Sequence, residues 1–260
     1  LYFKKISKYL VNGGLFILNY DDVYGGFFEY LKSYTLIKTC HKLNIKPDSI
    51  KDFKIAEKLF KKEFNKLNKS RSFKSWWKDQ LINPYAAKTW SFEELLKLAN
   101  SEQLTCYSTS PVFNDTNLLR WYKDIKLKNY KYSILNKQYY EIWKKNFLNF
   151  FIGVQQKKNF IIKKKTLISL RTFINKLNLC FANKNLNQDI KINNEIRELF
   201  KKNDLKLHIR EIEQLLKLLN SKDQNTNSII NFYLKSKKIK NTWGNLLHYA
   251  VFKKDFKIVR

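Results

Sequence analysis

Two neighbouring aspartates lie where a carboxylate could do chemistry. Asp21 and Asp22 follow directly after an apolar segment, in a short polar run that begins at Asn19. A carboxylate at the end of a buried strand could act as the general base for a substrate hydroxyl or amine. The same side chain could instead cap the helix that follows, because Asp is a favoured N-cap residue. The residues alone leave both interpretations open.

The cysteines and histidines show no spacing typical of a metal site or a disulfide framework. Cys40, Cys106 and Cys180 are odd in number and lie far apart in the chain, and none belongs to a Cys-x-x-Cys pair. Cys40 and His41 are adjacent, but two neighbours on a helix point to different faces and cannot hold one ion together. We therefore expect structural cysteines, no metal and a reducing compartment.

The charge of the chain is strongly basic. Lys and Arg number 51 against 22 Asp and Glu, which gives a formal net charge of +29. A field of this sign would attract phosphate backbones or anionic lipid surfaces. The lysines are spread along every segment, however, and the tight runs are short, at 163–165 and 237–238. Lys and Asn dominate the polar positions of the whole chain, so the sequence favours a general bias of composition over specific nucleic-acid binding.

Apolar residues are frequent, but no apolar run is long enough to cross a bilayer. Hydrophobic residues make up 44% of the chain, which is sufficient for a folded core. The most apolar stretch, residues 13–20, is far shorter than the roughly 18 residues that a membrane span requires. The opening segment also lacks the features of a secretory signal. We therefore expect a cytoplasmic protein with no membrane partner.

The aspartates follow a helix, a glycine turn and a strand. Apolar residues with helical spacing predict a helix over residues 2–10. The pair Gly13-Gly14 ends this helix, and residues 15–18 form an apolar run typical of a short buried strand. Helix, double-glycine turn, strand and acidic loop together form half a unit of a doubly wound α/β sheet.

A second helix-to-strand unit follows later in the chain. Ser91 and Glu94 have the spacing of a capping box, which predicts the start of a helix. Residues 103–109 have strand character and stop before Pro111, and residues 159–162 predict a third strand. Aromatic helices are expected over residues 117–150. Three strands are therefore expected in the first 165 residues.

Beyond residue 166 the pattern becomes helical. Apolar residues at Ile209, Ile212, Leu216 and Leu219 mark one face of an amphipathic helix, and a polar stretch over residues 221–228 is typical of a linker. These changes of composition predict boundaries near residues 165 and 225.

Two segments resemble class I S-adenosylmethionine (SAM)-dependent methyltransferases. Residues 1–20, LYFKKISKYLVNGGLFILNY, resemble the helix, glycine turn and fifth strand of that family. Residues 75–113, SWWKDQLINPYAAKTWSFEELLKLANSEQLTCYSTSPVF, are similar to a branch in which a Trp-x-x-Asp-Gln-Tyr element precedes His-Pro, a capped helix and a strand. Leu81 replaces the tyrosine of this element and Asn83 replaces the histidine. The ordered series, more than either segment alone, carries the resemblance.

The resemblance implies a substrate site at the end of the fifth strand. In the family, this end of the strand borders the pocket for the methyl acceptor, which implies a catalytic role for Asp21 or Asp22. Methyl transfer is an in-line displacement, so positioning contributes most and a general base is optional. The substrate-binding residues that the resemblance implies are Tyr20, Tyr24, Trp76, Trp77, Asp79 and Gln80. Packing in a core remains the alternative for the two tryptophans, and the acceptor is expected to be a small molecule or a glycan.

The cofactor-binding half of such an enzyme has no counterpart in these residues. The family binds SAM through a glycine-rich loop after its first strand and an acidic residue after its second. The chain has six glycines and no Gly-x-Gly-x-Gly. It begins at Leu1 and contains no methionine, so we expect the cofactor-binding elements to precede Leu1 in a longer parent. The cofactor-binding residues are therefore unknown, and the chain alone is expected to be inactive.

The end of the chain resembles the opening of an ankyrin repeat. In residues 241–260, NTWGNLLHYAVFKKDFKIVR, the series Leu247-His248-x-Ala250 matches the start of the first repeat helix. The resemblance implies a helix pair over residues 246–260 and a protein partner that binds through C-terminal repeats. His248 would then make structural hydrogen bonds.

These observations together predict an α/β fold: a partial doubly wound, Rossmann-like methyltransferase sheet with large helical insertions, followed by an all-α C-terminal region. The predicted segments are the C-terminal part of a methyltransferase domain (1–165), a helical linker region (166–225) and the start of an ankyrin-like repeat (226–260). A methyltransferase fragment predicts a partial sheet with one bare strand edge. The alternatives are a basic nucleic-acid-binding module, which predicts lysines on one face, and an ankyrin-type interaction protein.

Overall fold

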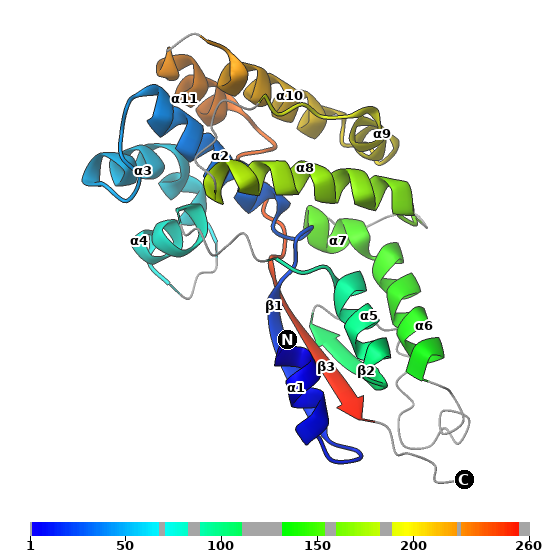
Figure 1. Ribbon diagram of the computed structural model, residues 1–260. Coiled ribbons are helices and arrows are strands. Elements are labelled where there is room, and N and C mark those ends of the chain that lie inside the picture. The colour runs from blue at the N-terminus through cyan, green and yellow to red at the C-terminus, as the bar shows by residue number, and fades with distance from the viewer. Residues whose placement is uncertain are drawn as a thin grey trace. The chain divides into compact units, whose positions relative to one another are not determined.

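Figure 1 shows the computed structural model of the chain. The structure describes residues 2–67, 71–82, 89–110, 132–153, 160–182, 189–222 and 225–254. The chain forms two compact units, each assembled from segments that are not consecutive. Residues 1–25, 89–162 and 245–260 form the first, called the sheet unit, and residues 26–88 and 163–244 form the second, called the helical unit.

Three strands lie in the described part of the sheet unit. They are β1 (Leu15–Asp21), β2 (Leu104–Ser110) and β3 (Leu247–Lys254). The order is β1-β3-β2, and β3 is antiparallel to both of its neighbours. It follows that β1 and β2 run in the same direction. The predicted mixture of helices and strands is confirmed. Strands are also found where residues 15–18 and 103–109 predicted them, as β1 and β2.

The described residues of the sheet unit also form four helices. They are α1 (Tyr2–Tyr9), α5 (Phe92–Ser101), α6 (Tyr132–Lys145) and α7 (Phe147–Phe151). The ring of Phe3 lies 5.3 Å from the rings of both Phe16 and Phe252, so α1 packs on one face of the sheet. Helices α5 and α6 both contact β2. One face of the sheet therefore carries the core of this unit.

Two local predictions in the sheet unit are confirmed. Gly13 adopts a positive φ of 79°, a conformation that favours glycine, and its N–H donates to the Lys254 carbonyl at 2.8 Å. This turn leads α1 into β1. Ser91 and Glu94 form the predicted capping box at the start of α5, each side chain accepting a hydrogen bond from the other residue's backbone N–H.

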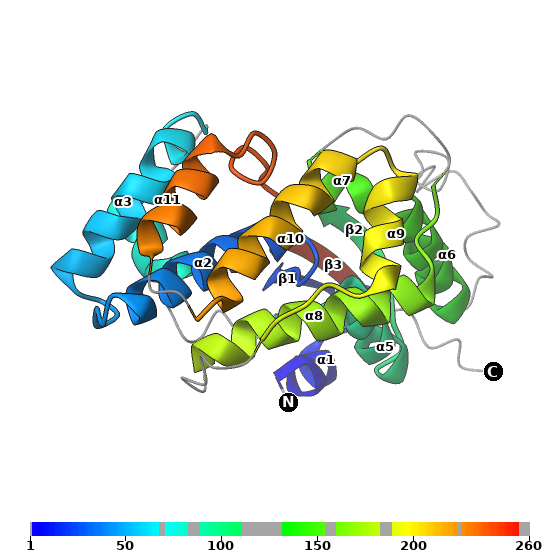
Figure 2. The same ribbon diagram turned by 90° about the horizontal axis from the view of Figure 1, so that it is seen from above.

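The helical unit packs around one central helix (Figure 2). Its elements are α2 (Phe27–Lys42), α3 (Ile50–Phe64), α4 (Phe73–Trp76), the π-helical turn η1 (Trp77–Leu81), α8 (Lys164–Ala182), α9 (Asn194–Lys202), α10 (Lys206–Asn220) and α11 (Thr226–Lys235). Helix α2 contacts α3, α8, α10, α11 and η1, and it is buried along most of its length. Ser49 caps α3, because its side chain accepts a hydrogen bond from the Asp52 N–H.

The third strand is not where the sequence predicted it. Residues 160–162 form no strand, and Asn159 lies outside the described residues. The third strand is β3, so the expected all-α C-terminal region is wrong, as is the helix expected over residues 246–260 in its described part, 246–254. The reason is the burial pattern, because His248, Ala250 and Phe252 are buried while Leu247 and Tyr249 are exposed, the period of two that a strand requires.

The two units interleave along the chain, whereas the sequence predicted three consecutive segments. The predicted limit near residue 165 lies close to the change from Ile162 to Lys163, where one unit gives way to the other. The predicted limit near residue 225 falls inside the helical unit. Helices α6 and α7 confirm the part of the predicted aromatic helices that follows residue 131, and residues 117–131 lie outside the described part.

None of the helices in the described segments combines the length and the apolar character that a membrane span requires.

Candidate functional site

The candidate site lies at the end of β1 in the sheet unit. The chain stays hydrogen-bonded beyond the strand, because the Asp22 N–H donates to the Leu246 carbonyl at 2.7 Å. On the opposite edge, the Trp90 N–H donates to the Asp21 carbonyl at 3.0 Å, and the Val23 N–H donates to the Trp90 carbonyl at 2.9 Å. Residues 21–23 are therefore held between two other segments of the same unit.

Asp22 shapes the turn that follows β1. Its side chain is fully buried, and Oδ1 accepts hydrogen bonds from the N–H groups of Tyr24 at 2.9 Å and Gly25 at 2.7 Å. The other oxygen, Oδ2, lies 3.9 Å from Nδ1 of His248. A carboxylate in this position fixes the backbone of the turn, and its burial keeps it out of reach of a substrate.

Tyr20 and His248 complete a buried polar cluster next to Asp22. The Tyr20 hydroxyl lies 3.4 Å from Nδ1 of His248. Burial lowers the pKa of His248 to about 4, against an opposing effect of a backbone hydrogen bond with Asn245. Burial, and then the charge of Asp22, raise the pKa of Tyr20. At neutral pH the histidine is therefore uncharged and the tyrosine keeps its proton.

Gly25 allows two segments of the sheet unit to cross closely. A Cβ atom at this position would lie 1.8 Å from the backbone oxygen of Asn245, so only glycine fits. Sequence reasoning missed Gly25, although the pair Gly25-Gly26 directly after the acidic loop was a readable signal. It also assigned His248 to a repeat helix, whereas the residue lies in β3.

Tyr24 and Asp21 differ in how accessible their side chains are to a substrate. Tyr24 is buried, and its ring lies 5.8 Å from that of Trp143 and 5.6 Å from that of Phe147, so it forms part of the core with α6 and α7. Asp21 is only partly buried, at the last position of β1. Of the two aspartates, Asp21 is the one that solvent reaches.

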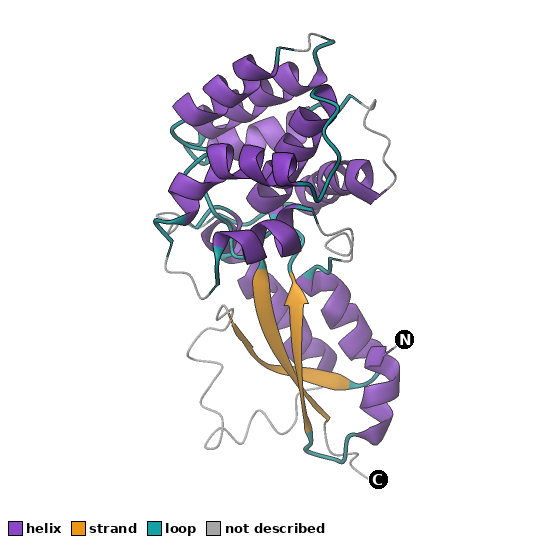
Figure 3. Cartoon of the chain, turned by 90° about the vertical axis from the view of Figure 1, so that its left-hand side faces the viewer, coloured by secondary structure: helices purple, strands orange, loops and turns teal. Residues whose placement is uncertain are grey.

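One face of the sheet carries exposed apolar side chains. We call it the open face, and its members on two adjacent strands are Leu15, Ile17 and Asn19 of β1 and Leu247, Tyr249, Val251 and Lys253 of β3. Ile17 is 67% exposed and Leu247 is 48% exposed. Asp21 pairs in register with Leu247 and so lies at the end of this face. Figure 3 shows the three strands in orange. A contiguous exposed apolar face of this kind marks an interaction surface.

The two outer edges of the sheet differ. On β2, Asn136 of α6 accepts from the Cys106 N–H at 2.7 Å and donates to the Leu104 carbonyl at 2.9 Å, and the Tyr139 hydroxyl donates to the Tyr107 carbonyl. These side chains satisfy the backbone of that edge. Apart from the parallel bridge of Asp22 with Trp90 just beyond its end, the outer edge of β1 pairs with no strand among the described residues. An unpaired edge of this kind is a template for a further strand.

Trp76 and Trp77, predicted as substrate-binding residues, lie in the core of the helical unit. Both are buried. The Trp76 Nε1–H donates to Oε2 of Glu29 at 3.3 Å, and its ring lies 5.2 Å from Phe64. The Trp77 ring lies 5.0 Å from Phe53. These contacts are those of packing.

Asp79 and Gln80 also belong to the helical unit. Asp79 is exposed and receives hydrogen bonds from the Ser75 hydroxyl at 3.4 Å and from Arg71 at 3.3 Å, and Gln80 is half-buried. The structure therefore gathers Tyr20, Asp21, Asp22 and Tyr24 within the sheet unit. It places the four later residues in the helical unit.

The described part of the chain holds no group of three or more His, Cys, Asp or Glu side chains that could bind a metal ion. Cys40 and Cys106 are buried free thiols, and burial raises the pKa of both. The side chain of Cys180 lies outside the described residues.

Comparison of the chain with protein-family models, with curated proteins and with solved structures finds no match in any of the three. The function has to be argued from the residues and from the arrangement of the strands.

Proposed function

We propose that the sheet unit is the acceptor-binding end of a class I SAM-dependent methyltransferase. The order and direction of the strands carry this proposal. β1 and β2 run in the same direction, and β3, the last strand along the chain, lies between them in the opposite direction. A class I methyltransferase sheet ends in the same way, with its last strand reversed between the fifth and the sixth.

The sequence resemblance supports the same correspondence from independent information. It assigns residues 15–18 to the fifth strand of the family and places the capped helix and the strand that begins at Leu104 after it. These are β1, α5 and β2. In the family, the reversed strand follows these elements along the chain. Here β3 takes that place, although the sequence alone predicted an ankyrin-repeat helix for its residues.

The free edge of β1 and the open face support the proposal that a cofactor-binding half continues this sheet. A partial sheet was expected to leave one edge bare, and the two edges of this sheet do differ, since side chains of α6 satisfy β2. A strand paired with β1 and a helix laid over Ile17 and Leu15 would remove this apolar surface from water. We propose that the cofactor-binding half supplies both.

The cofactor does not fit the described residues. The turn after β1 closes against Asn245 at Gly25 and is filled by the Asp22 carboxylate, which leaves no cradle for a nucleoside. We therefore derive no step through SAM and assign the acceptor side alone to this chain. There, Asp21 is the accessible carboxylate that can orient the acceptor hydroxyl or amine and take its proton, while Asp22 positions the backbone around it.

Strand β3 occupies the residues that the ankyrin resemblance assigned to the first repeat helix. The structure therefore removes the basis for a protein partner that binds through C-terminal repeats.

The coding sequence upstream of Leu1 tests the proposal most directly. We expect it to encode an apolar strand followed by a glycine-rich loop. By calorimetry, the longer protein should bind SAM at micromolar concentration, and the 260-residue chain should not. Micromolar binding by the 260-residue chain, or an upstream sequence without such a loop, would overturn the assignment.

A variant of the longer protein tests the role of Asp21. We expect Asp21→Asn to lower the rate of transfer of a radiolabelled methyl group by about 10²-fold, the lower end for loss of a general base. The matched control is Asp204→Asn, at an exposed position of the helical unit, which should leave the rate unchanged. Equal rates for Asp21→Asn and the unaltered protein would exclude Asp21 as the group that handles the proton.

A further inference from the structure

The outer face of α3 in the helical unit gathers lysines that the sequence shows only as scattered. Lys51, Lys54, Lys58 and Lys62 follow one another at intervals of three or four residues. At 3.6 residues per turn, all four lie within a sector of about 80° around the helix axis. All four side chains are exposed. We call this set the lysine stripe.

The acidic residues of the same helix do not neutralise the lysine stripe. Asp52 and Glu63 are both buried. Asp52 accepts from the Asp48 N–H at 3.0 Å, and Glu63 lies 3.8 Å from the Lys240 ammonium. Glu57 pairs with Lys61 at 2.6 Å, a lysine outside the stripe. The positive charge therefore points outward while the two buried carboxylates point into the unit.

The apolar side of α3 is also turned inward. Ala56, Leu59, Phe60 and Phe64 are buried, whereas Ile50, at the first position of α3, is 77% exposed. One exposed apolar side chain at the end of the helix does not make an apolar face that could enter a bilayer. Helices that bind lipid surfaces present such a face together with their charges. No aromatic residue belongs to the stripe either, so it offers nothing to stack on a base. A row of lysines without these partners fits phosphate groups alone.

The length of the lysine stripe matches a row of phosphates. Eleven residues separate Lys51 from Lys62, which at 1.5 Å per residue is about 16 Å. One strand of a duplex rises about 3.4 Å along the axis for each phosphate while it winds around that axis, so a straight stripe of this length contacts about three consecutive phosphates. We propose that the lysine stripe of α3 binds the phosphodiester backbone of a nucleic-acid duplex without reading its sequence.

This binding surface is independent of the proposed methyl transfer. The stripe lies on the helical unit, and nothing in its chemistry requires an acceptor site or a cofactor. Loss of duplex binding and loss of methyl transfer are therefore separate outcomes, measured with different ligands.

The test measures binding of a fluorescently labelled 20-base-pair duplex by anisotropy over a series of salt concentrations. The stripe variant replaces Lys51, Lys54, Lys58 and Lys62 with Gln. The control variant replaces four other exposed lysines of the helical unit with Gln: Lys164, Lys176, Lys206 and Lys217. Both variants lose four charges, from +29 to +25, so they differ only in where the charge is lost.

We expect the stripe variant to bind at least tenfold more weakly and its slope of log K against log salt to fall by about 3, since each lost phosphate contact removes about 0.9. The control should change the slope by less than about 1. Equal losses in the two variants would show that net charge alone attracts the duplex and would overturn the proposal. Absence of binding by the unaltered chain, or tighter binding to anionic vesicles than to the duplex, would do the same. Circular dichroism checks that both variants keep their helices.

Discussion

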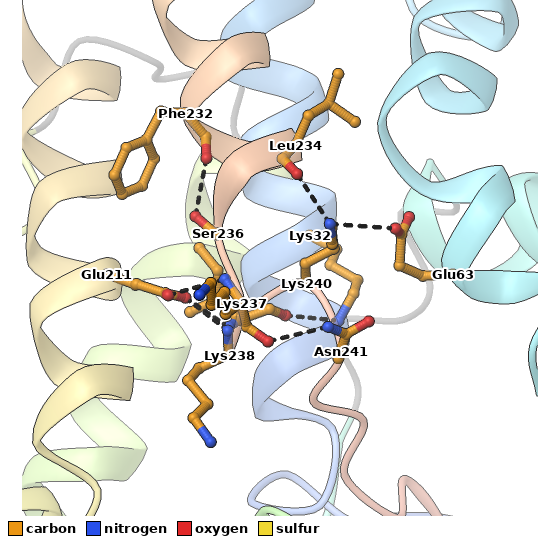
Figure 4. A network of polar contacts seen from close by, with 11 residues as sticks. Lys32, Glu63, Glu211, Phe232, Leu234, Ser236, Lys237, Lys238, Lys240 and Asn241 are labelled. Atoms are coloured by element: carbon orange, nitrogen blue, oxygen red, sulfur yellow. Dashed lines mark hydrogen bonds and ion pairs between the residues drawn. The ribbon is translucent and has the colours of Figure 1, made fainter.

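The two units bury their polar groups in different ways. In the sheet unit the buried cluster at the end of β1 contains a neutral histidine and a protonated tyrosine, and its one carboxylate is held by backbone N–H groups. In the helical unit, charged side chains bind the backbone of an irregular segment, residues 237–242. Figure 4 shows the polar network around this segment.

Two charged groups hold that segment of the helical unit. The Glu211 carboxylate accepts from the N–H groups of Lys237, Lys238 and Ile239, each at 2.9 Å. The ammonium of buried Lys32 donates to the Thr242 carbonyl at 2.8 Å. The same ammonium lies 4.0 Å from the centre of the Trp243 ring, a cation–π contact.

This comparison shows which groups each unit satisfies internally and which surfaces it leaves exposed. The helical unit satisfies the backbone of residues 237–242 internally and turns the lysine stripe of α3 outward. The sheet unit keeps a regular hydrogen-bonded core on one face but leaves the open face and the edge of β1 exposed. The predictions that follow test this contrast, beginning with the largest expected effect.

The first prediction compares the two faces of β3. Phe252 is fully buried and packs edge-on against Phe3 at 5.3 Å, so Phe252→Ala should lower the free energy of unfolding by about 4 kcal/mol. Tyr249 lies on the open face and is 40% exposed, so Tyr249→Ala should cost less than about 1 kcal/mol. Urea unfolding followed by circular dichroism measures both. Similar losses would mean that the open face is covered in the folded chain.

The second prediction concerns the buried lysine of the helical unit. Burial lowers the pKa of Lys32 to about 7, with Glu29 and Glu63 opposing the shift. Between pH 7 and 10 the unfolded chain keeps a proton that the folded chain has lost, so stability rises with pH in this window. Three pH units at 1.36 kcal/mol each give about 4 kcal/mol.

Removal of the lysine should abolish this rise. We expect Lys32→Met to flatten the increase in unfolding free energy between pH 7 and 10, while Lys42→Met, at a half-buried position at the end of the same helix, leaves it in place. Guanidinium unfolding at several pH values provides the measurement. A Lys32→Met variant with the same pH dependence as the unaltered chain would show that Lys32 is not titrating in this range.

Much of the local structure of the sheet unit could be predicted from sequence, because the signals are short-range. The Gly13-Gly14 turn and the Ser91 capping box each depend on residues within four positions of one another. Strand β3 could not be predicted in this way. Its partners lie more than 100 residues away in β1 and β2, and the sequence Leu247-His248-x-Ala250 also fits a helix face.

The candidate site was predictable in part for the same reason. Asp21 and Asp22 could be placed at the end of a strand, but the sequence could not tell them apart. Their roles depend on burial, which is set by Leu246 and His248 of a distant segment. The lysine stripe could not be recognised from the distribution of lysines along the chain, because it depends on their positions around the axis of α3 and on which face of that helix is buried.

The third prediction is an acid-sensitive step in the sheet unit. The pKa of His248 is lowered to about 4 by burial, so the unfolded chain binds a proton first as the pH falls below 6.5. Stability contributed by the neutral ring should be lost between pH 6.5 and 4, about 3 kcal/mol in all. Hydrogen exchange of β3 amides reports on this unit directly.

A histidine variant separates this loss from the titration of carboxylates in the same range. His248→Gln should remove the acid-dependent loss of protection in β3, whereas His41→Gln, at an exposed position of the helical unit, should retain it. If β3 protection falls equally in His248→Gln and the unaltered chain, another group causes the acid sensitivity.

The fourth prediction compares two glutamates on the same helix, α10. Glu211 is buried and accepts three backbone N–H groups, and Glu211→Gln replaces a charged acceptor by a neutral amide that also brings unneeded donors. We expect a loss of about 2 kcal/mol in unfolding free energy, since hydrogen bonds to charged groups are the stronger kind. Glu213 lies two residues away, partly exposed, in an ion pair with Arg197, and Glu213→Gln should cost less than about 1 kcal/mol. Urea unfolding of the two variants makes the comparison at equal charge. A Glu213 variant that loses as much as the Glu211 variant would mean that the helical unit is stabilised by its surface ion pairs and not by the buried carboxylate that holds residues 237–239.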